Sequence, residues 1–279
     1  MGFRFNGRWY DEGYYTRPRP VKIIGRRTSV TTVNDIWPNG TAQDGNMTIQ
    51  AGVTLGISSG SASDTSAGTG ARTVVVVGVD TSGIQRTVTL TLNGQTKVTD
   101  TSGYSFVAVN LAYVATWGSG LANAGKIYIY DSTDTVTTGE NATIAKRLSI
   151  IDTSMNVSQT GFYTVPTIGN DVCDLLITGV HTLSMDATTT VKYAEYNMLV
   201  NYFRFNGISL GLAGKATWFD IDFGTHSSSS SPIQWPPPQV GECLVVLNGG
   251  TLRTQVTASA ALGTAAGIDV FGLLVARAA

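Results

Sequence analysis

The chain has 279 residues, of which 42% are hydrophobic and 13% charged, with a formal net charge of −1. So many hydrophobic residues with so little net charge exclude a disordered chain and suffice for one large core or two modest ones. Val, Thr, Ile, Tyr and Phe fill the periodic segments, and helix-forming runs of Glu, Lys, Leu and Ala are missing, so we predict an all-β fold.

The first segment, residues 1–27, is basic and aromatic. It holds seven basic and two acidic side chains, a net charge of +5, whereas the other 11 basic and 17 acidic residues give −6. Pro18 and Pro20 exclude helix, so we expect an extended arm. Its arginine and aromatic content predicts docking on its own body, a neighbouring copy or another protein. The candidate docking residues are Arg4, Arg8, Trp9, Tyr10, Arg17, Arg19, Arg26 and Arg27.

Two β-sandwich units of the jelly-roll kind are expected after the arm, over residues 28–155 and 156–279. Whether they share one large core stays open. Asn93 and Gly94 predict a type I′ hairpin turn, because both central residues of that turn need positive φ. The expected strands of the first unit are residues 47–57, 73–77, 84–92, 104–116, 126–130 and a pair within 143–151. Those of the second are residues 162–165, 173–185, 191–205, 216–223, 243–247, 251–258 and 268–277.

The residues that could carry chemistry do not form a recognisable site. The Gly-rich segment 66–73 lacks Gly-Lys-Ser/Thr and leads into a strand, which indicates a β–β connection rather than a phosphate cradle. The two histidines, His181 and His226, lie in a strand-like run and a Ser-rich loop, so neither predicts a hydrolytic triad. Two acidic pairs are interpreted as solvated side chains rather than as glycosidase or calcium sites: Asp220 with Asp222, and Asp131 with Asp134. We therefore expect no catalytic, cofactor-binding or metal-binding residue, and no enzyme activity.

The cysteines, the apolar runs and the charge distribution predict the compartment and the partners of the protein. Cys173 and Cys243 are expected to be buried free thiols, with a single bridge as the alternative. No run of about 18 apolar residues predicts a membrane span, and no secretory signal is visible, so we expect synthesis in a cytoplasm. The acidic body would repel a polyanion, which argues against nucleic acid despite the basic arm.

Three passages resemble the β-rich virion structural proteins of tailed bacteriophages. They are residues 30–37 (VTTVNDIW), 63–74 (SDTSAGTGARTV, continuing through Gly78, Asp80 and Gly83 to Asn93-Gly94) and 162–166 (FYTVP). In that family a glycine and a lysine usually follow the proline of the third passage, whereas Thr167 and Ile168 follow it here. The resemblance covers roughly residues 28–170 and implies a structural particle component without catalysis.

Within a virion, the arm favours a capsid cement or decoration protein that binds the shell, assembles in the host cytoplasm and forms a homo-oligomer, expected to be a trimer. Its partners would be the major capsid protein or other virion proteins. Three alternatives remain: a tail or adsorption protein whose Trp117, Trp218 or Trp235 stacks on host glycans, a double-jelly-roll capsid subunit, and a polysaccharide-degrading enzyme.

Overall fold

The chain divides into two units, and its described residues form β-strands with one short 3₁₀ turn, η1 (Ile144–Lys146), which agrees with the predicted all-β class. The computed structural model describes residues 3–5, 8–10, 15–27, 33–35, 50–158, 161–182, 193–205, 208–211, 219–227, 234–235, 244–258 and 266–277. Unit 1 comprises residues 1–42 and 161–279, and unit 2 comprises residues 43–160. Within the described ranges, no helix is long and apolar enough to cross a membrane.

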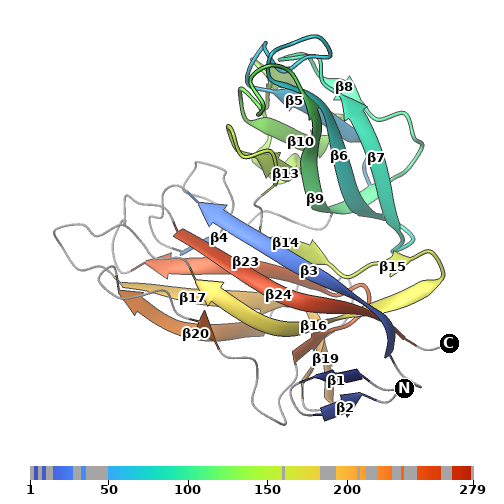
Figure 1. The fold of residues 1–279 in the computed structure, drawn as a ribbon, viewed down its shortest axis with the longest axis vertical. Helices are drawn as coiled ribbons and strands as arrows, with labels where there is room; N and C mark the ends of the chain where they lie inside the picture. The colour runs from blue at the N-terminus through green and yellow to red at the C-terminus, as the bar shows by residue number, and fades with distance from the viewer. Residues whose placement is uncertain are drawn as a thin grey trace. The chain divides into compact units, whose positions relative to one another are not determined.

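Unit 2 is a sandwich-like pair of antiparallel sheets (Figure 1). The first sheet has the order β13-β10-β5-β8, from β5 (Leu55–Ser59), β8 (Val98–Thr99), β10 (Ile127–Asp131) and β13 (Arg147–Ile151). The second has the order β7-β6-β9, from β6 (Ala71–Asp80), β7 (Gln85–Thr91) and β9 (Phe106–Trp117). Alternate apolar residues of both sheets, such as Ile57, Val76, Leu90 and Ile129, form one core, as the period of two in a strand requires.

A second layer covers the outer face of the first sheet of unit 2. It contains β11 (Val136–Thr137) and β12 (Glu140–Asn141), and Gly139 between them lies so close to Ser59 O that a side chain would not fit. Asp134 is buried and accepts hydrogen bonds from Asn141 Nδ2 at 2.9 Å and Thr143 N at 2.9 Å. The expectation that Asp134 is solvated is therefore wrong, because its carboxylate organises this layer.

Asp64 holds together the loops at one end of unit 2. Its fully buried carboxylate accepts hydrogen bonds from Ser59 Oγ (2.5 Å), Ala71 N (2.7 Å), Ala124 N (2.8 Å) and Gly125 N (3.0 Å). These donors lie on β5, on β6 and in the loop before β10, so one side chain fixes three segments. The segment between β5 and β6 is the β–β connection that the sequence predicts.

Unit 1 contains two larger antiparallel sheets and a hairpin. One sheet has the order β14-β23-β17-β20, with β4 also paired to β23, from β4 (Val33–Asp35), β14 (Phe162–Thr164), β17 (Tyr193–Val200), β20 (Phe219–Ser227) and β23 (Thr251–Ala258). The other has the order β19-β18-β22-β16-β24-β3, with β15 (Thr167–Ile168) and β21 (Gln234–Trp235) also paired to β16. Its main strands are β3 (Tyr15–Arg27), β16 (Asp171–Thr182), β18 (Tyr202–Phe205), β19 (Ile208–Gly211), β22 (Leu244–Val246) and β24 (Ala266–Arg277). The hairpin is β1 (Phe3–Phe5) with β2 (Arg8–Tyr10).

The larger sheet of unit 1 buries apolar residues on both faces. In β16, Leu175 and Ile177 belong to the main core, whereas Leu176 joins a smaller cluster with Val245 and Val275. The main core also receives residues from β3, β14 and β23, so strands of both sheets share it. Cys173 is a buried free thiol within this core, which confirms the prediction for that cysteine; Cys243 lies outside the described residues.

The structure differs from the predicted boundaries at the N-terminus. Residues 15–27 are not a separate arm: they form β3, which pairs with β24 from Arg27 opposite Ala266 to Tyr15 opposite Arg277. Residues 33–35 form β4, which pairs with β23, so residues up to 42 belong to unit 1 and not to the first β unit. Unit 2 is thus inserted between two parts of unit 1.

Two local predictions are also corrected. Gly94 has a φ of 59°, but the tight turn joins Asn93 to Thr96, and Asn93 is not among the residues with positive φ, so the turn is not type I′. Nor does this turn close a hairpin, because β7 pairs with β6 and β8 pairs with β5. Residues 191–205, expected as one strand, contain β17 and β18, which belong to different sheets.

Replacing Asp64 tests its role in unit 2. We expect Asp64→Asn to lower the free energy of unfolding of unit 2 by about 3 kcal/mol, because an amide NH₂ would face backbone N–H donors that no longer have an acceptor. Native-state hydrogen exchange of the β6 and β10 amides measures this change.

Asp131→Asn is the matched control, because Asp131 accepts only local hydrogen bonds from Thr133 N and Oγ1, both at 2.9 Å, at an exposed turn. We expect a change within about 0.5 kcal/mol for it. Equal exchange free energies in the two variants would show that Asp64 does not hold the loops together.

Candidate docking surface on the N-terminal strand

β3 forms the outer edge of the larger sheet of unit 1, and its sequence suits that position. Pro20 lies opposite Leu273, and Pro18 falls where the β3–β24 register shifts. An edge strand tolerates proline because one row of its N–H groups needs no partner in the sheet. The prolines that predict an extended segment therefore also restrict this strand to an edge.

Three charged residues of β3 and β24 form the centre of the candidate surface, which we call the β3–β24 face. Asp269 lies in β24 with its side chain only 6% exposed. Lys22 Nζ approaches its carboxylate at 2.9 Å and Arg26 Nη1 approaches it at 2.6 Å. Lys22 and Arg26 alternate with Ile23, which points into the core, so both cations lie on the opposite face of the strand. A buried carboxylate is thus neutralised by two cations of the N-terminal strand.

The pKa of Asp269 reflects two opposing effects. Burial by itself raises the pKa of this carboxyl group, but the ion pairs with Arg26 and Lys22 outweigh burial and hold the pKa below its ordinary value. Asp269 is therefore charged at neutral pH and tied to β3.

The eight predicted docking residues have different positions in the structure. Arg26 is ion-paired as described, and Arg19 Nη2 lies 3.5 Å from Asp171 Oδ2 in a more exposed pair, so both bind within their own unit. The other predicted residues lie in β1 (Arg4), in β2 (Arg8, Trp9, Tyr10) and in β3 (Arg17, Arg27), and their side chains lie outside the described residues. Arg19 and Arg26 thus pair with carboxylates of their own chain, which is one of the three docking possibilities that the sequence left open.

A shallow groove of about 370 Å³ adjoins these ion pairs. It exists because β16 carries one extra residue, Thr178, opposite β24, and because Gly272 has no side chain, where a Cβ atom would clash with Leu175. Lys22 Nζ lies 5.4 Å from the centre of the Phe271 ring, which is 38% exposed. The lining residues are Pro20, Val21, Lys22, Thr178, Phe271, Gly272 and Leu273.

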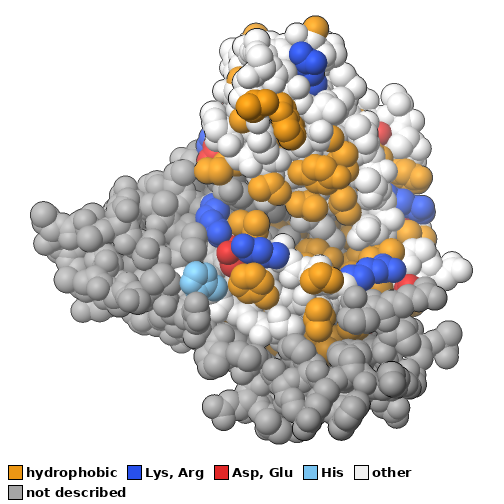
Figure 2. Space-filling model, in the orientation of Figure 1, with side chains coloured by type: hydrophobic (Ala, Val, Ile, Leu, Met, Phe, Trp, Pro, Cys, Tyr) orange, Lys and Arg blue, Asp and Glu red, His pale blue; other side chains and the backbone are white. Residues whose placement is uncertain are grey.

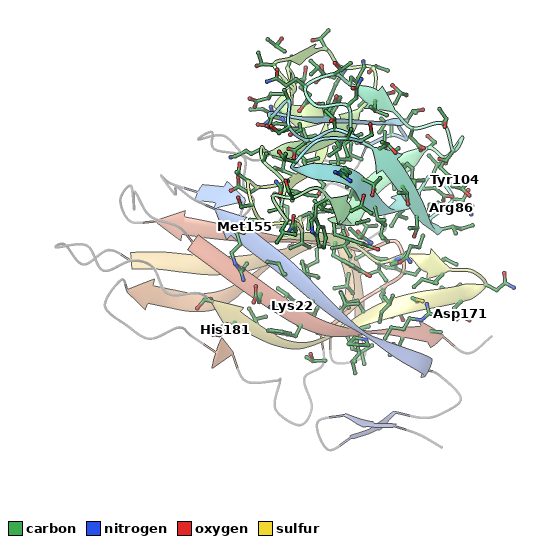
Figure 3. The ribbon with its side chains drawn as sticks, turned by 45° about the horizontal axis from the view of Figure 1, so that its top comes forward. Lys22, Arg86, Tyr104, Met155, Asp171 and His181 are labelled. Carbon is green, nitrogen blue, oxygen red and sulfur yellow. The ribbon has the colours of Figure 1, made fainter. Side chains whose placement is uncertain are left out.

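The side chains around this groove suit a protein partner. Figure 2 shows basic and acidic side chains, a histidine and hydrophobic side chains gathered on the face where β3 and β24 lie in Figure 1. Lys22 on β3 and His181 on β16 lie on either side of β24 (Figure 3). An apolar or aromatic side chain could enter the groove, with Lys22 attracting an acidic neighbour. In the part of the chain that the structure describes, no three His, Cys, Asp or Glu residues are grouped so that they could hold a metal ion.

Sequence reasoning missed Asp269, Phe271 and Asp171 as members of this surface. One signal was present: Asp269 stands between Ile268 and Val270 in an apolar strand, and a carboxylate in such a run needs a cation. Asp220 and Asp222 lie in β20, and their side chains lie outside the described residues. His226 also lies in β20 and not in the predicted loop, and its side chain is likewise outside the described residues.

Comparisons with known proteins give no family for this chain. No family model matches it, and no curated protein matches it. Among solved structures, the chain is compared with one described as the structure of infectious bursal disease virus Gx strain, at 12% identity, covering 94% of this chain and 80% of that one. The TM-score is 0.12, so this likeness carries no argument about fold or function.

Removing the Asp269 charge tests how β3 is held. We expect Asp269→Asn to lower the free energy of unfolding of unit 1 by about 1–2 kcal/mol at pH 7, because Lys22 and Arg26 lose their counter-charge but are partly hydrated. The folded-state pKa of Asp269 is below its unfolded value, so its contribution is complete above about pH 4 and is lost as the pH falls through the folded-state pKa.

Urea unfolding of both proteins between pH 7 and pH 3 measures this difference. Asp171→Asn is the control, and we expect a smaller effect because the Arg19–Asp171 pair is longer and more exposed. A difference between the wild type and Asp269→Asn that grows on acidification would contradict the assignment.

Proposed function

We propose that the protein is a non-enzymatic structural component of a bacteriophage virion, of the capsid cement or decoration type, located in the virion after assembly in the host cytoplasm. In this proposal its units are jelly-roll-like, it forms a trimer, and its partner is the major capsid protein or another virion protein. The sequence resemblance over residues 30–37, 63–74 and 162–166 supports the class. The position of the N-terminal residues supports the mode of binding.

The observation that carries the proposal is the β1–β2 hairpin. Its register pairs Arg4 with Trp9 and Phe5 with Arg8, and among the described strands β1 and β2 pair only with each other. A two-stranded hairpin is marginally stable in water unless it packs against something. Its six strand residues are all aromatic or arginine, the types that anchor protein interfaces.

The position of β3 inside unit 1 limits which of residues 1–27 can dock on a partner. Residues 15–27 are needed inside unit 1, where β3 completes the sheet and Ile23 enters the core. The part of residues 1–27 that remains for a partner is the hairpin, assisted by the β3–β24 face with its groove. A shell-binding segment attached to a firmly paired strand transmits load to the whole unit.

One observation favours a second candidate, the glycan-binding tail or adsorption protein. Trp117 at the end of β9 is 41% exposed and Tyr113 on the same strand is 38% exposed, so two aromatic rings are accessible on unit 2. Trp218 and Trp235 have side chains outside the described residues. A glycan array distinguishes the candidates, because a signal lost in Trp117→Ala is expected only for the tail protein.

Two units with separate cores also suit a double-jelly-roll capsid subunit, which the copy number of the chain per particle would identify.

Deleting residues 1–14 tests the proposed docking. We expect the truncated protein to lose co-sedimentation with shells of the phage that encodes it, because the hairpin is gone, while its thermal unfolding stays close to that of the full chain. Deleting residues 1–27 is expected to unfold unit 1, because β24 loses one of its two partner strands and Ile23 leaves the core.

A variant with Arg4→Lys and Arg8→Lys is the matched control, because it keeps the charge and removes the planar guanidinium groups. We expect it to bind more weakly than the wild type but more strongly than the truncated protein. Unchanged shell binding after deletion of residues 1–14 would overturn the proposed docking segment.

A further inference from the structure

Among the residues that the structure describes, nothing pairs with the outer edge of β7 in unit 2. It is an outer strand of the β7-β6-β9 sheet and pairs with β6 without any register shift. At the two ends of this ladder Leu92 N donates to Arg72 O and Asp80 N donates to Ile84 O, both at 2.9 Å. Hydrogen-bonded and non-hydrogen-bonded pairs alternate in an antiparallel ladder, so even-numbered residues of β7 bond to β6. The N–H and C=O groups of the odd-numbered residues, which are Thr87, Thr89 and Thr91, point away from β6.

This edge lacks the features that prevent strand pairing at the edges formed by β3 and β9. On β3, two prolines and a register shift interrupt the edge, and Gly161 N donates to Ile24 O at 2.9 Å. On β9, the outer edge is occupied by residues 156–158, through Val114 N to Asn156 O and Ser158 N to Ala112 O, both 2.8 Å. Residues 87–91 of β7 contain no proline, glycine or charge. A regular, uncharged edge of this kind accepts another strand.

The nearest charged side chain is already engaged within unit 2. Arg86 Nε donates to Asp80 Oδ2 at 2.6 Å, and its guanidinium carbon lies 4.7 Å from the centre of the Tyr104 ring (Figure 3). Asp80 also accepts hydrogen bonds from Ser82 N and Ile84 N. The edge therefore offers a strand partner neither an attractive nor a repulsive free charge, which disfavours a strongly acidic or basic peptide.

We propose that two copies of the chain pair through their β7 edges, antiparallel, about a two-fold axis at Thr89. The sequence of residues 87–91, TVTLT, reads almost the same in both directions. This register places Thr89 opposite Thr89 of the second copy and Thr87 opposite its Thr91. All three outward-facing residues of each strand then form hydrogen-bonded pairs, and the two three-stranded sheets become one continuous sheet.

Self-complementarity identifies the second copy as the occupant of this edge. Every threonine faces a threonine, and cross-strand threonine pairs stabilise antiparallel sheets. Val88 and Leu90, which are buried in the core of unit 2, face Leu90 and Val88 of the second copy, so the two cores become continuous. Arg86 faces Leu92, so like charges never meet. An isologous two-fold contact of this kind closes on itself.

The inference goes beyond the proposed function and does not depend on it, because it uses unit 2 and not the N-terminal hairpin. A trimer formed elsewhere on the chain would become a dimer of trimers through this contact. Failure of the shell-binding test would therefore leave the β7 pairing standing, and failure of the pairing would leave shell binding standing.

The test replaces Thr89 by proline in the full chain. Because the Thr89 N–H points away from β6, Thr89→Pro removes a donor from the edge without removing a β6–β7 hydrogen bond. Thr89→Val is the matched control, because it keeps the N–H and the β-branched side chain. Sedimentation equilibrium at chain concentrations up to about 0.1 mM gives the assembly mass, and circular dichroism verifies the fold. We expect Thr89→Pro to have half the assembly mass of the wild type, and Thr89→Val to keep the wild-type mass.

Hydrogen exchange provides a second, residue-level measurement. In the wild type we expect slow exchange at the Thr87, Thr89 and Thr91 amides, and in Thr89→Pro we expect fast exchange at Thr87 and Thr91. An assembly mass that is equal in the wild type and in folded Thr89→Pro would overturn the pairing. Fast exchange at these amides in the wild type would also overturn the pairing, and the partner of the β7 edge would then be a strand of another protein.

Discussion

The pairing of β3 with β24 is the contact on which unit 1 depends. It joins strands near opposite ends of the sequence, and all of unit 2 lies between them in the chain. Bringing the two ends of such a long loop together lowers the chain entropy, so the β3–β24 pairing has to bury enough apolar surface and pair enough charge to offset that loss. Ile23 in the core and Asp269 between two cations supply that compensation. Unit 2 is continuous in sequence and can form its core without waiting for this closure.

Two strands were predictable from the sequence to within one residue at each end. Residues 251–258, predicted as a strand, are β23 with the same bounds, and β7 differs from its prediction by one residue at each end. The break between β17 and β18 was not predictable, because the apolar pattern continues through it. There the buried amide of Asn201 accepts a hydrogen bond from Thr251 N at 2.7 Å, where the chain passes from one sheet to the other. Which sheet a strand joins depends on such tertiary bonds and leaves little trace in a local pattern.

The candidate surface was predictable in composition but not in its contacts. A sequence shows that β3 is basic, but the carboxylates that neutralise it lie in distant segments and are identified only by folding. The loop of residues 61–72 is a second case in which the sequence does not show the contacts of a residue. Its glycines predict a β–β connection, but only the structure shows why Gly70 is required: a side chain there would clash with the Asp64 carboxylate. The glycine at position 70 thus has a structural explanation in the Asp64 contacts and does not indicate a ligand.

The edge strands of the two units differ in how readily they can pair with another strand, and this difference affects assembly. Unit 1 ends its large sheet with a strand whose prolines and ion pairs discourage further pairing, and it reserves an arginine-rich hairpin outside that sheet. Unit 2 ends a sheet with uncharged threonines. A single edge contact gains only about 0.5–1.5 kcal/mol from each hydrogen bond, against several kcal/mol lost on association. The β7 contact therefore has to gain from its three outward-facing residues and from the joined cores together, and it would gain further by effective concentration if the proposed hairpin contact held the same copies on a common scaffold.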